Sequence, residues 1–281
     1  MTSVQDTFPT QLNSPTPREA ALLLAHVLGR TREWVLAHPE AELTPEQSER
    51  FSRLMEQAER GAPLPYLLGQ WEFFGLSFKV TPDVLIPRPE TELLVEKALE
   101  KIPNLRHSPQ KARESQNPKI VDVGTGSGII AVTLAVKLPH AHIAATDVSA
   151  AALEVARANA VAHGAGDRVQ FIQGDLLEGV GKENLICANL PYISTAELAT
   201  LPVAKHEPTL ALDGGPDGMR VVERLLATAS KHLLQGGALL AELGATQGEA
   251  AATLARHYFP LARVEVHKDL AGLDRLLEIN L

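Results

Sequence analysis

The chain has 281 residues, 45% of them hydrophobic, which is enough for one or two globular domains with sizeable cores. A net charge of −8 argues against broad, charge-driven binding to nucleic acid, so protein or small-molecule partners are favoured. No apolar run approaches the roughly 18 residues that span a bilayer and no leader pattern opens the chain, so we expect a soluble, cytoplasmic protein without membrane contact.

Two amphipathic helices are predicted before residue 62. TPRE from Thr16 and TPEQ from Thr44 each combine an N-cap, a proline at the first helical position and a capping-box acceptor. Apolar residues then recur at helical spacing, and Gly29 and Gly61 stand where C-caps belong. The pattern predicts a small helical domain over residues 1–70.

A connector is predicted over residues 71–95. In WEFFGLSFKV the apolar residues alternate around Gly75, which predicts a hairpin, followed by a proline-punctuated loop and a helix from about Thr91. The stretch NLRHSPQKARESQNP, residues 104–118, is polar and without periodicity, so we expect an exposed loop.

From residue 119 short apolar runs alternate with helical segments. The runs are KIVDVG, HIAATD, RVQFIQGD, LICANL and GALLAELG, with helical segments after the first, second and fourth. This order predicts an α/β fold with a doubly wound, mostly parallel sheet, and ARVEVHKD with LDRLLEIN predicts an antiparallel hairpin at its edge. The single cysteine, Cys187, lies inside an apolar run and is expected to be a buried structural thiol.

A glycine loop follows the first of these strands. VDVGTGSGII places Gly124, Gly126 and Gly128 between a strand and a helix, where a ligand can approach the backbone and the helix N-terminus closely. The spacing differs from the dinucleotide fingerprint GxGxxG, and a tight strand-to-helix turn without a ligand is the alternative.

Acidic residues end the next two strands. Asp147 lies 23 residues after Gly124, where a carboxylate could accept hydrogen bonds from both hydroxyls of a ribose. The alternative is an N-cap for the following helix, a role that Ser149 could fill instead. The third strand ends in Gly174-Asp175, so successive strands place ligand-suited groups at the edge where open α/β sheets bind ligands.

The fourth strand ends in Asn-Leu-Pro-Tyr, residues 189–192. Asn189 offers a side-chain carbonyl, Leu190 a backbone carbonyl before a proline, and Tyr192 a flat ring. Two acceptors and a stacking face suit a planar NH₂ group, whose lone pair can then be turned toward an electrophile. An ordinary turn is the alternative interpretation.

GTGSGIIAVTLA, Asp147 and NLPYIS resemble the class I S-adenosylmethionine-dependent methyltransferases that modify planar nitrogens. Residues 63–96, PLPYLLGQWEFFGLSFKVTPDVLIPRPETELLVE, and residues 207–219, EPTLALDGGPDGM, are similar to the release-factor glutamine methyltransferases, the PrmC or HemK family. This resemblance extends from the N-terminal helices to the closing strands. It implies a Rossmann-like class I fold and methylation of the glutamine side-chain amide in the Gly-Gly-Gln motif of peptide-chain release factors.

The resemblance also implies a role for each candidate site residue. The methionine part of S-adenosylmethionine is expected over the glycine loop, its ribose on Asp147, its adenine near residues 175–176, and the substrate amide against residues 189–192. The implied cofactor-binding residues are Gly124, Thr125, Gly126, Ser127, Gly128, Asp147, Asp175, Leu176 and Asn189, and the implied catalytic and substrate-binding residues are Asn189, Leu190, Pro191 and Tyr192. No metal is expected.

Two further expectations concern the regions before the glycine loop. The IPRPET loop is expected to cover the cofactor, with Arg88, Glu90 and Thr91 near its methionine part, although Thr91 is equally well explained as the cap of the next helix. The helical domain of residues 1–70 is expected to dock the release factor, and residues 96–281 to form the methyltransferase domain.

The tetrapeptide leaves an alternative open. The family's usual form is Asn-Pro-Pro-Tyr, and the Asn-Leu-Pro-Tyr of this chain also occurs in ribosomal RNA adenine dimethyltransferases, so RNA or DNA adenine methylation is the second hypothesis. Those enzymes carry their helical domain after the catalytic one and favour a basic surface, whereas here the helices come first and the charge is negative. We therefore expect action on release factors without direct nucleic-acid binding. We also expect a monomer.

Overall fold

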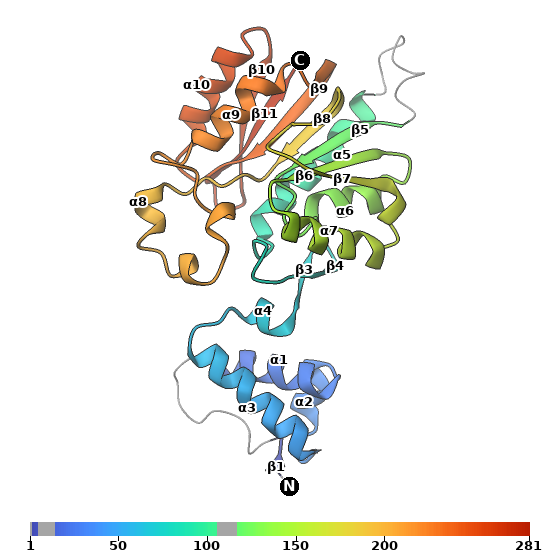
Figure 1. The fold of residues 1–281 in the computed structure, drawn as a ribbon, viewed down its shortest axis with the longest axis vertical. Helices are drawn as coiled ribbons and strands as arrows, with labels where there is room; N and C mark the ends of the chain where they lie inside the picture. The colour runs from blue at the N-terminus through green and yellow to red at the C-terminus, as the bar shows by residue number, and fades with distance from the viewer. Residues whose placement is uncertain (1, 5–14, 106–116) are drawn as a thin grey trace. The chain divides into compact units, whose positions relative to one another are not determined.

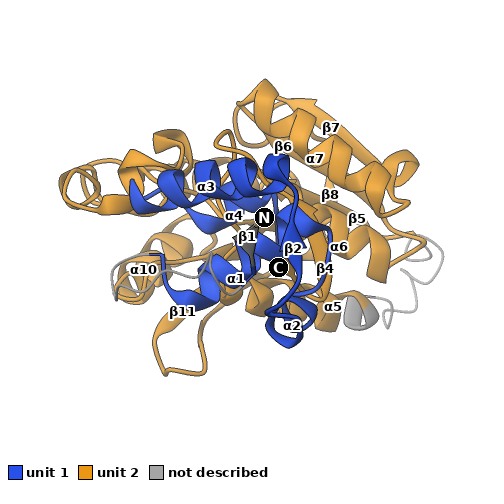
Figure 2. Cartoon of the chain, turned by 90° about the horizontal axis from the view of Figure 1, so that it is seen from below, with its two compact units in different colours: residues 1–71 blue, residues 72–281 orange. Residues whose placement is uncertain are grey.

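The computed structural model describes residues 2–4, 15–105 and 117–281, and the chain divides into two compact units, Met1–Trp71 and Glu72–Leu281 (Figure 2). Most of the loop predicted over residues 104–118 lies outside the described residues. Within the described part of the chain, no helix is both long and apolar enough to cross a bilayer.

The first unit packs short helices around one apolar core. Its elements are α1 (Pro17–Leu28), α2 (Arg32–Ala37), α3 (Pro45–Glu59), α4 (Leu64–Leu68) and the paired strands β1 (Thr2–Ser3) and β2 (Glu42–Leu43). Both predicted capping boxes are present, at Thr16 and Thr44, and Gly29 caps α1 in the left-handed conformation. The C-cap of α3 is Arg60 rather than Gly61, because the glycine takes the left-handed position just after it.

The second unit is built on a seven-stranded sheet in the order β10-β11-β9-β8-β5-β6-β7 (Figure 1). The strands are β5 (Lys119–Val123), β6 (His142–Asp147), β7 (Val169–Gln173), β8 (Glu183–Ala188), β9 (Leu233–Glu242), β10 (Arg263–Lys268) and β11 (Asp274–Asn280). The first five of these run parallel, and β11 pairs antiparallel with both β9 and β10. The predicted sheet and its antiparallel edge hairpin are confirmed.

Helices cover both faces of this sheet, because neighbouring strand residues alternate between two apolar cores. One face carries α5 (Glu92–Leu105), α6 (Ile129–Lys137) and α7 (Ala150–Ala162), and the other carries α9 (Arg220–Ala229) and α10 (Gly248–Tyr258) (Figure 1). Ile120 and Leu185 point into the first core, whereas Val121 and Ile186 point into the second. Cys187 is fully buried and free, as predicted.

The predicted hairpin around Gly75 consists of β3 (Gln70–Phe73) and β4 (Leu76–Lys79). Phe74 and Gly75 both have positive φ, the backbone that two-residue hairpin turns need. The N–H of Phe74 donates to the Glu92 carboxylate at the start of α5, which ties the turn to that helix. The remaining short elements are η2 (Pro89–Thr91), η3 (Gly166–Arg168), α8 (Thr195–Leu198), η4 (Pro202–Lys205) and η5 (Thr209–Ala211).

The strand order reverses at β5, which lies between β6 on one side and β8 on the other. The connection from β5 runs to β6, and the chain later returns to β8 across the sheet. Open α/β sheets bind ligands in the crevice that such a reversal leaves at the carboxyl ends of the strands.

Candidate active site

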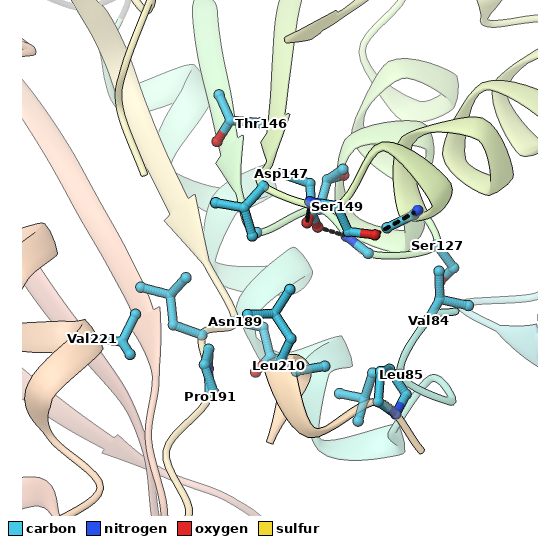
Figure 3. Close-up of a pocket in the computed structure, with 18 of the residues that line it drawn as sticks. Val84, Leu85, Ser127, Thr146, Asp147, Ser149, Asn189, Pro191, Leu210 and Val221 are labelled. Carbon is cyan, nitrogen blue, oxygen red and sulfur yellow. Dashed lines mark hydrogen bonds between the residues drawn. The ribbon is translucent and has the colours of Figure 1, made fainter. Parts of the chain in front are cut away.

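A cavity of about 750 Å³ lies at the carboxyl ends of β5 to β8 (Figure 3). The segments that follow these four strands all contribute to its wall, and two loops from elsewhere in the unit complete it. Asp147, Asn189 and Leu210, three of the residues labelled in Figure 3, come from three separate segments of the chain.

The glycine loop after β5 is held by a buried carboxylate. Asp122 is fully buried, and its Oδ2 accepts hydrogen bonds from the Thr125 hydroxyl at 2.6 Å and the Ala131 N–H at 3.1 Å. Burial raises the pKa of Asp122 to about 7. This side chain therefore fastens the loop to the first turn of α6, while Gly124 to Ser127 face the cavity.

Asp147, at the end of β6, lies against the same loop. Its Oδ2 accepts the Gly126 N–H and its Oδ1 accepts the Ser149 N–H, each at 2.9 Å. Burial raises the pKa of this carboxyl, and these backbone donors oppose the shift. Ser149 is the N-cap of α7, so the predicted alternative role for Asp147 falls to Ser149.

The segment after β7 contributes Asp175 and Leu176 to the cavity wall. Leu176 has φ 51°, which is uncommon for a residue with a side chain, and its carbonyl accepts the Thr146 hydroxyl at 2.7 Å. Asp175 forms an ion pair with Arg224 of α9, and both side chains are about half exposed. The Leu176 backbone is thus fixed beside the cavity by a neighbouring strand.

Asn189 follows β8, and its side-chain amide is hydrogen-bonded on one side only. Its Nδ2 donates to the Thr91 hydroxyl at 2.9 Å, across 98 residues of sequence. Thr91 is fully buried, and its hydroxyl receives Asn189 while α5 begins at the next residue. Among the described residues no donor reaches Asn189 Oδ1, so the carbonyl end of the amide remains available in the cavity wall.

Tyr192 is held at both its ring and its backbone. Its hydroxyl lies 3.4 Å from Glu242 Oε1 at the end of β9, and its carbonyl accepts Gln247 Nε2 at 2.8 Å. Burial raises the pKa of Tyr192 to about 12, so the phenol is neutral at physiological pH. Gln247 also accepts the Gly244 N–H at 2.8 Å, which links the loop after β9 to the tetrapeptide.

Two loops over the cavity are joined by Glu207. This buried carboxylate accepts the Ile86 N–H at 3.0 Å and pairs with Arg88 at 2.5 Å. The joined segments contribute apolar residues to the wall, and these were not predicted individually from the sequence. They are Val84, Leu85, Ile86, Pro87, Pro208, Leu210 and Ala211.

The structure brings most of the sequence-predicted site residues together. The residues that line the cavity are Gly124, Thr125, Gly126, Ser127, Asp147, Asp175, Leu176, Asn189, Leu190 and Pro191. Gly128 and Tyr192 are not among the lining residues. Gly128 packs against α7, where an added Cβ would lie 3.1 Å from that of Ala156, and its role in cofactor binding stays a prediction.

Two family models match the chain. The PrmC N-terminal domain matches residues 11–69, and the methyltransferase small domain matches residues 105–206. Together they cover the helices of the first unit and the glycine loop, β6, β7 and the tetrapeptide of the second.

Similar curated proteins span nearly the whole chain. The release factor glutamine methyltransferase of Moorella thermoacetica is 44% identical over 92% of this chain and 88% of its own length. That of Bordetella pertussis is 42% identical over 92% of both chains.

Solved structures share the fold at low sequence identity. A methyltransferase from Pyrococcus furiosus superimposes with a TM-score of 0.52 at 17% identity, over 84% of this chain and 98% of its own. The N-terminal domain of human METTL16 in complex with SAH superimposes with a TM-score of 0.52 at 16% identity, over 97% of this chain and 98% of its own.

The sheet order, the glycine loop and the cavity at the strand ends define a class I methyltransferase. Given the identity to its curated relatives over most of its length, the chain belongs to the release factor glutamine methyltransferase family.

Proposed function

We propose that this chain transfers the methyl group of S-adenosylmethionine to the side-chain amide nitrogen of the glutamine in the Gly-Gly-Gln motif of peptide-chain release factors. The names of its relatives support the release factor as the substrate, and the hydrogen bonding of Asn189 supports methylation of an amide nitrogen. The observation that carries the proposal is the Asn189 amide, whose NH₂ is bound to Thr91 while its oxygen is left as an acceptor.

The cavity wall suits S-adenosylmethionine. An added Cβ at Gly126 would meet nothing within 4 Å, so the loop leaves open space at its tip where a methionine part can approach the backbone. Asp147 can still accept hydrogen bonds from ribose hydroxyls, because a carboxylate offers about four lone-pair sites and the Gly126 and Ser149 N–H groups each take one, on different oxygens. When bound, S-adenosylmethionine supplies an electrophilic methyl group on a positively charged sulfur.

The tetrapeptide binds the substrate amide in this proposal. Asn189 Oδ1 and the Leu190 carbonyl accept the two N–H groups of the glutamine NH₂, and the Tyr192 ring covers its planar face. Holding both hydrogens fixes the orientation of the amide plane, so that the nitrogen lone pair, which is perpendicular to that plane, is directed toward the methyl group. A residue with only donors here would reject the NH₂ group.

The two acceptors also stabilise the positive charge that develops on the nitrogen during the reaction. As the nitrogen attacks, a carbon–nitrogen bond forms, the carbon–sulfur bond breaks and positive charge develops on nitrogen. Asn189 Oδ1 and the Leu190 carbonyl stabilise that charge, and the nitrogen loses its extra proton to solvent when the methylated product leaves the site. Apolar residues of the two covering loops, including Leu85, Ile86 and Leu210, exclude water from the reacting atoms.

The first unit docks the release factor in this proposal. It matches the PrmC N-terminal domain model and forms a compact core of its own. A chain of residues 72–281 should keep cofactor binding and methylate a short Gly-Gly-Gln peptide, but it should lose methylation of intact release factor. Equal rates of the truncated and full chains on intact factor would remove the docking role.

The activity is tested with isotopically labelled S-adenosylmethionine and purified release factor. We expect one labelled glutamine, located by peptide mapping, and no label in a release factor whose motif is changed to Gly-Gly-Ala. Adenine methylation is the competing outcome, so an RNA and a DNA containing unmodified adenine are incubated in parallel. Label in nucleic acid but not in the release factor would overturn the proposal.

A further inference from the structure

Glu242 is a buried carboxylate behind the tetrapeptide. It is the last residue of β9, 1% exposed, and it does not line the cavity. The Tyr192 hydroxyl donates to its Oε1 at 3.4 Å. Its Oε2 makes no hydrogen bond of normal geometry among the described residues, which leaves a buried acceptor unpaired.

Thr91 lies between this carboxylate and Asn189. Its oxygen accepts the Asn189 Nδ2–H at 2.9 Å, so its own proton must be donated elsewhere. The Thr91 hydroxyl lies close enough to Glu242 to lower the pKa of that carboxyl, against the larger effect of burial. Oε2 is the unpaired oxygen of this buried carboxylate, and we take it as the acceptor that the Thr91 proton requires.

The direction of these hydrogen bonds follows from the chemistry of each group. A carboxylate only accepts, so the Thr91 hydroxyl donates to it and keeps its lone pairs for Asn189. Thr91 then can accept only the NH₂ end of the Asn189 amide, and the oxygen end is left toward the cavity. A neutral donor at position 242 would permit the reverse order, in which Thr91 donates to Asn189 Oδ1 and the NH₂ group faces the cavity.

We propose that Glu242 is a positioning residue that, through the Thr91 hydroxyl, fixes the Asn189 side chain with its oxygen toward the substrate amide. The same carboxylate accepts a hydrogen bond from the Tyr192 hydroxyl. Neither Asn189 nor Tyr192 then presents a donor to the substrate. This inference rests on the proposed function for its substrate, but the orientation of Asn189 can be measured without it. It also explains selection of glutamine over glutamate, because a carboxylate substrate would face acceptors only.

The kinetic test uses variants of both relay residues in the full-length chain. Thr91→Val keeps the shape but removes the hydroxyl, and we expect kcat to fall by about tenfold or more, as when a supporting partner of a site residue is lost. Thr91→Ser keeps the hydroxyl and should restore most of that loss. The dissociation constant for S-adenosylmethionine should change by less than about threefold in both Thr91 variants, since Thr91 does not line the cavity.

Glu242→Gln has a matched control in this chain. Glu183 is also buried, and burial raises the pKa of its carboxyl to about 7, but it begins β8 at the opposite end of the strand from Asn189. Glu242→Gln should lower kcat and Glu183→Gln should not. Equal kcat for Glu242→Gln and wild type, with thermal unfolding showing both folded, would overturn the proposal.

The orientation itself is read from the Asn189 side-chain NH₂ signals in ¹⁵N-labelled protein, assigned by their loss in Asn189→Asp. We expect them to shift in Thr91→Val and Glu242→Gln and to stay in place in Thr91→Ser and Glu183→Gln. Signals unmoved in either of the first two variants would overturn the relay. Failure of the wild type to methylate release factor would instead overturn the proposed function, and these signals would still decide the orientation.

Discussion

The Leu190 side chain packs against Gly124 so closely that a Cβ at residue 124 would lie 3.0 Å from Leu190 Cδ2. Gly124 has φ 71°, Leu190 is 5% exposed, and both line the cavity. The glycine loop and the tetrapeptide are therefore fitted to each other at the position where this chain departs from the usual Asn-Pro-Pro-Tyr. The leucine has its own packing partner rather than being an isolated replacement.

Leu190→Pro should be tolerated. Proline keeps the backbone carbonyl that the proposed amide site needs, and its ring gives up only part of the contact with Gly124. We expect kcat within about threefold of wild type and a loss of about 1 kcal/mol in the free energy of unfolding. Leu190→Ala, which removes the packing without fixing φ, is the control. A tenfold fall in kcat for the proline variant alone would mean that the loop here requires the leucine backbone conformation.

Asn189→Ala should lower kcat by about 10² or more, comparable with the loss of one oriented group at a reacting centre. The affinity for S-adenosylmethionine should change little, because the glycine loop and Asp147 remain. Rates come from single-turnover methylation of release factor, and affinity comes from calorimetry. A variant that methylates the glutamine at the wild-type rate would refute the amide role of this residue.

Much of the fold followed from local patterns. Sequence reasoning found the capping boxes at Thr16 and Thr44, the period-two alternation around Gly75 and the short apolar runs from residue 119 onward, because each of these patterns is contained within a few residues. Helix α10 was not predicted, although it follows β9 in the same alternating order.

The long-range contacts that hold the site residues in place could not be predicted from local sequence patterns. Thr91 contacts Asn189 across 98 residues, and Glu207 contacts Ile86 across 121. No local period encodes such contacts, because they depend on how the loops return over the sheet edge. The IPRPET loop was expected to cover the cofactor, and EPTLALDGGPDGM was noted for its resemblance to the family. Thr91 was nevertheless explained equally well as a helix cap, and only the structure shows its hydroxyl bound to Asn189.

Asp147→Ala should weaken binding of S-adenosylmethionine by roughly 1.5 to 3 kcal/mol, because charge-assisted hydrogen bonds to the ribose are lost. Part of the loss will come from the loop itself, since Asp147 also accepts the Gly126 and Ser149 N–H groups. Calorimetry measures the affinity, and Ser149→Ala shows how much the capped start of α7 contributes, because it removes the capping hydroxyl but keeps the N–H that Asp147 accepts. An unchanged affinity in Asp147→Ala would exclude this carboxylate from the site.

The rate should rise as the pH increases from 6 to 8. Burial raises the pKa of Glu242 to about 7, with Glu90 acting in the same direction and Thr91, Arg275 and Tyr192 opposing it. Above that pH the Glu242 carboxylate only accepts hydrogen bonds, as the relay requires. Below that pH the protonated carboxyl can donate a hydrogen bond to Thr91, and the Asn189 side chain is then no longer held with its oxygen toward the substrate.

The pH profile of kcat is measured at saturating substrates in wild type and Glu242→Gln. The variant should lose the rise near pH 7 and stay at the low level, because its neutral amide resembles the protonated acid. Burial also raises the pKa of Asp122 to about 7, so a rise that persists in Glu242→Gln would assign the titration elsewhere and contradict this prediction.

Gly218→Ala should damage both stability and turnover. Gly218 has φ 76°, and a Cβ there would overlap the Tyr192 carbonyl oxygen and lie 2.7 Å from Gln247 Nε2, the donor that holds this carbonyl. The segment after the tetrapeptide is already fixed, because Ile193 donates to the Leu212 carbonyl and accepts the Gly214 N–H. The tetrapeptide must therefore move to admit the methyl group.

Gly164→Ala is the control that measures the cost in stability of a left-handed alanine without any displacement of the tetrapeptide. Gly164 has φ 64° and nothing within 4 Å of an added Cβ, so the substitution should cost only the roughly 1–2 kcal/mol of a left-handed residue and leave kcat unchanged. Gly218→Ala should unfold at a lower temperature than Gly164→Ala and lose about tenfold or more in kcat, because Tyr192 and Asn189 share the displaced backbone. Equal stability and full turnover in the two variants would show that the tetrapeptide does not depend on this close approach.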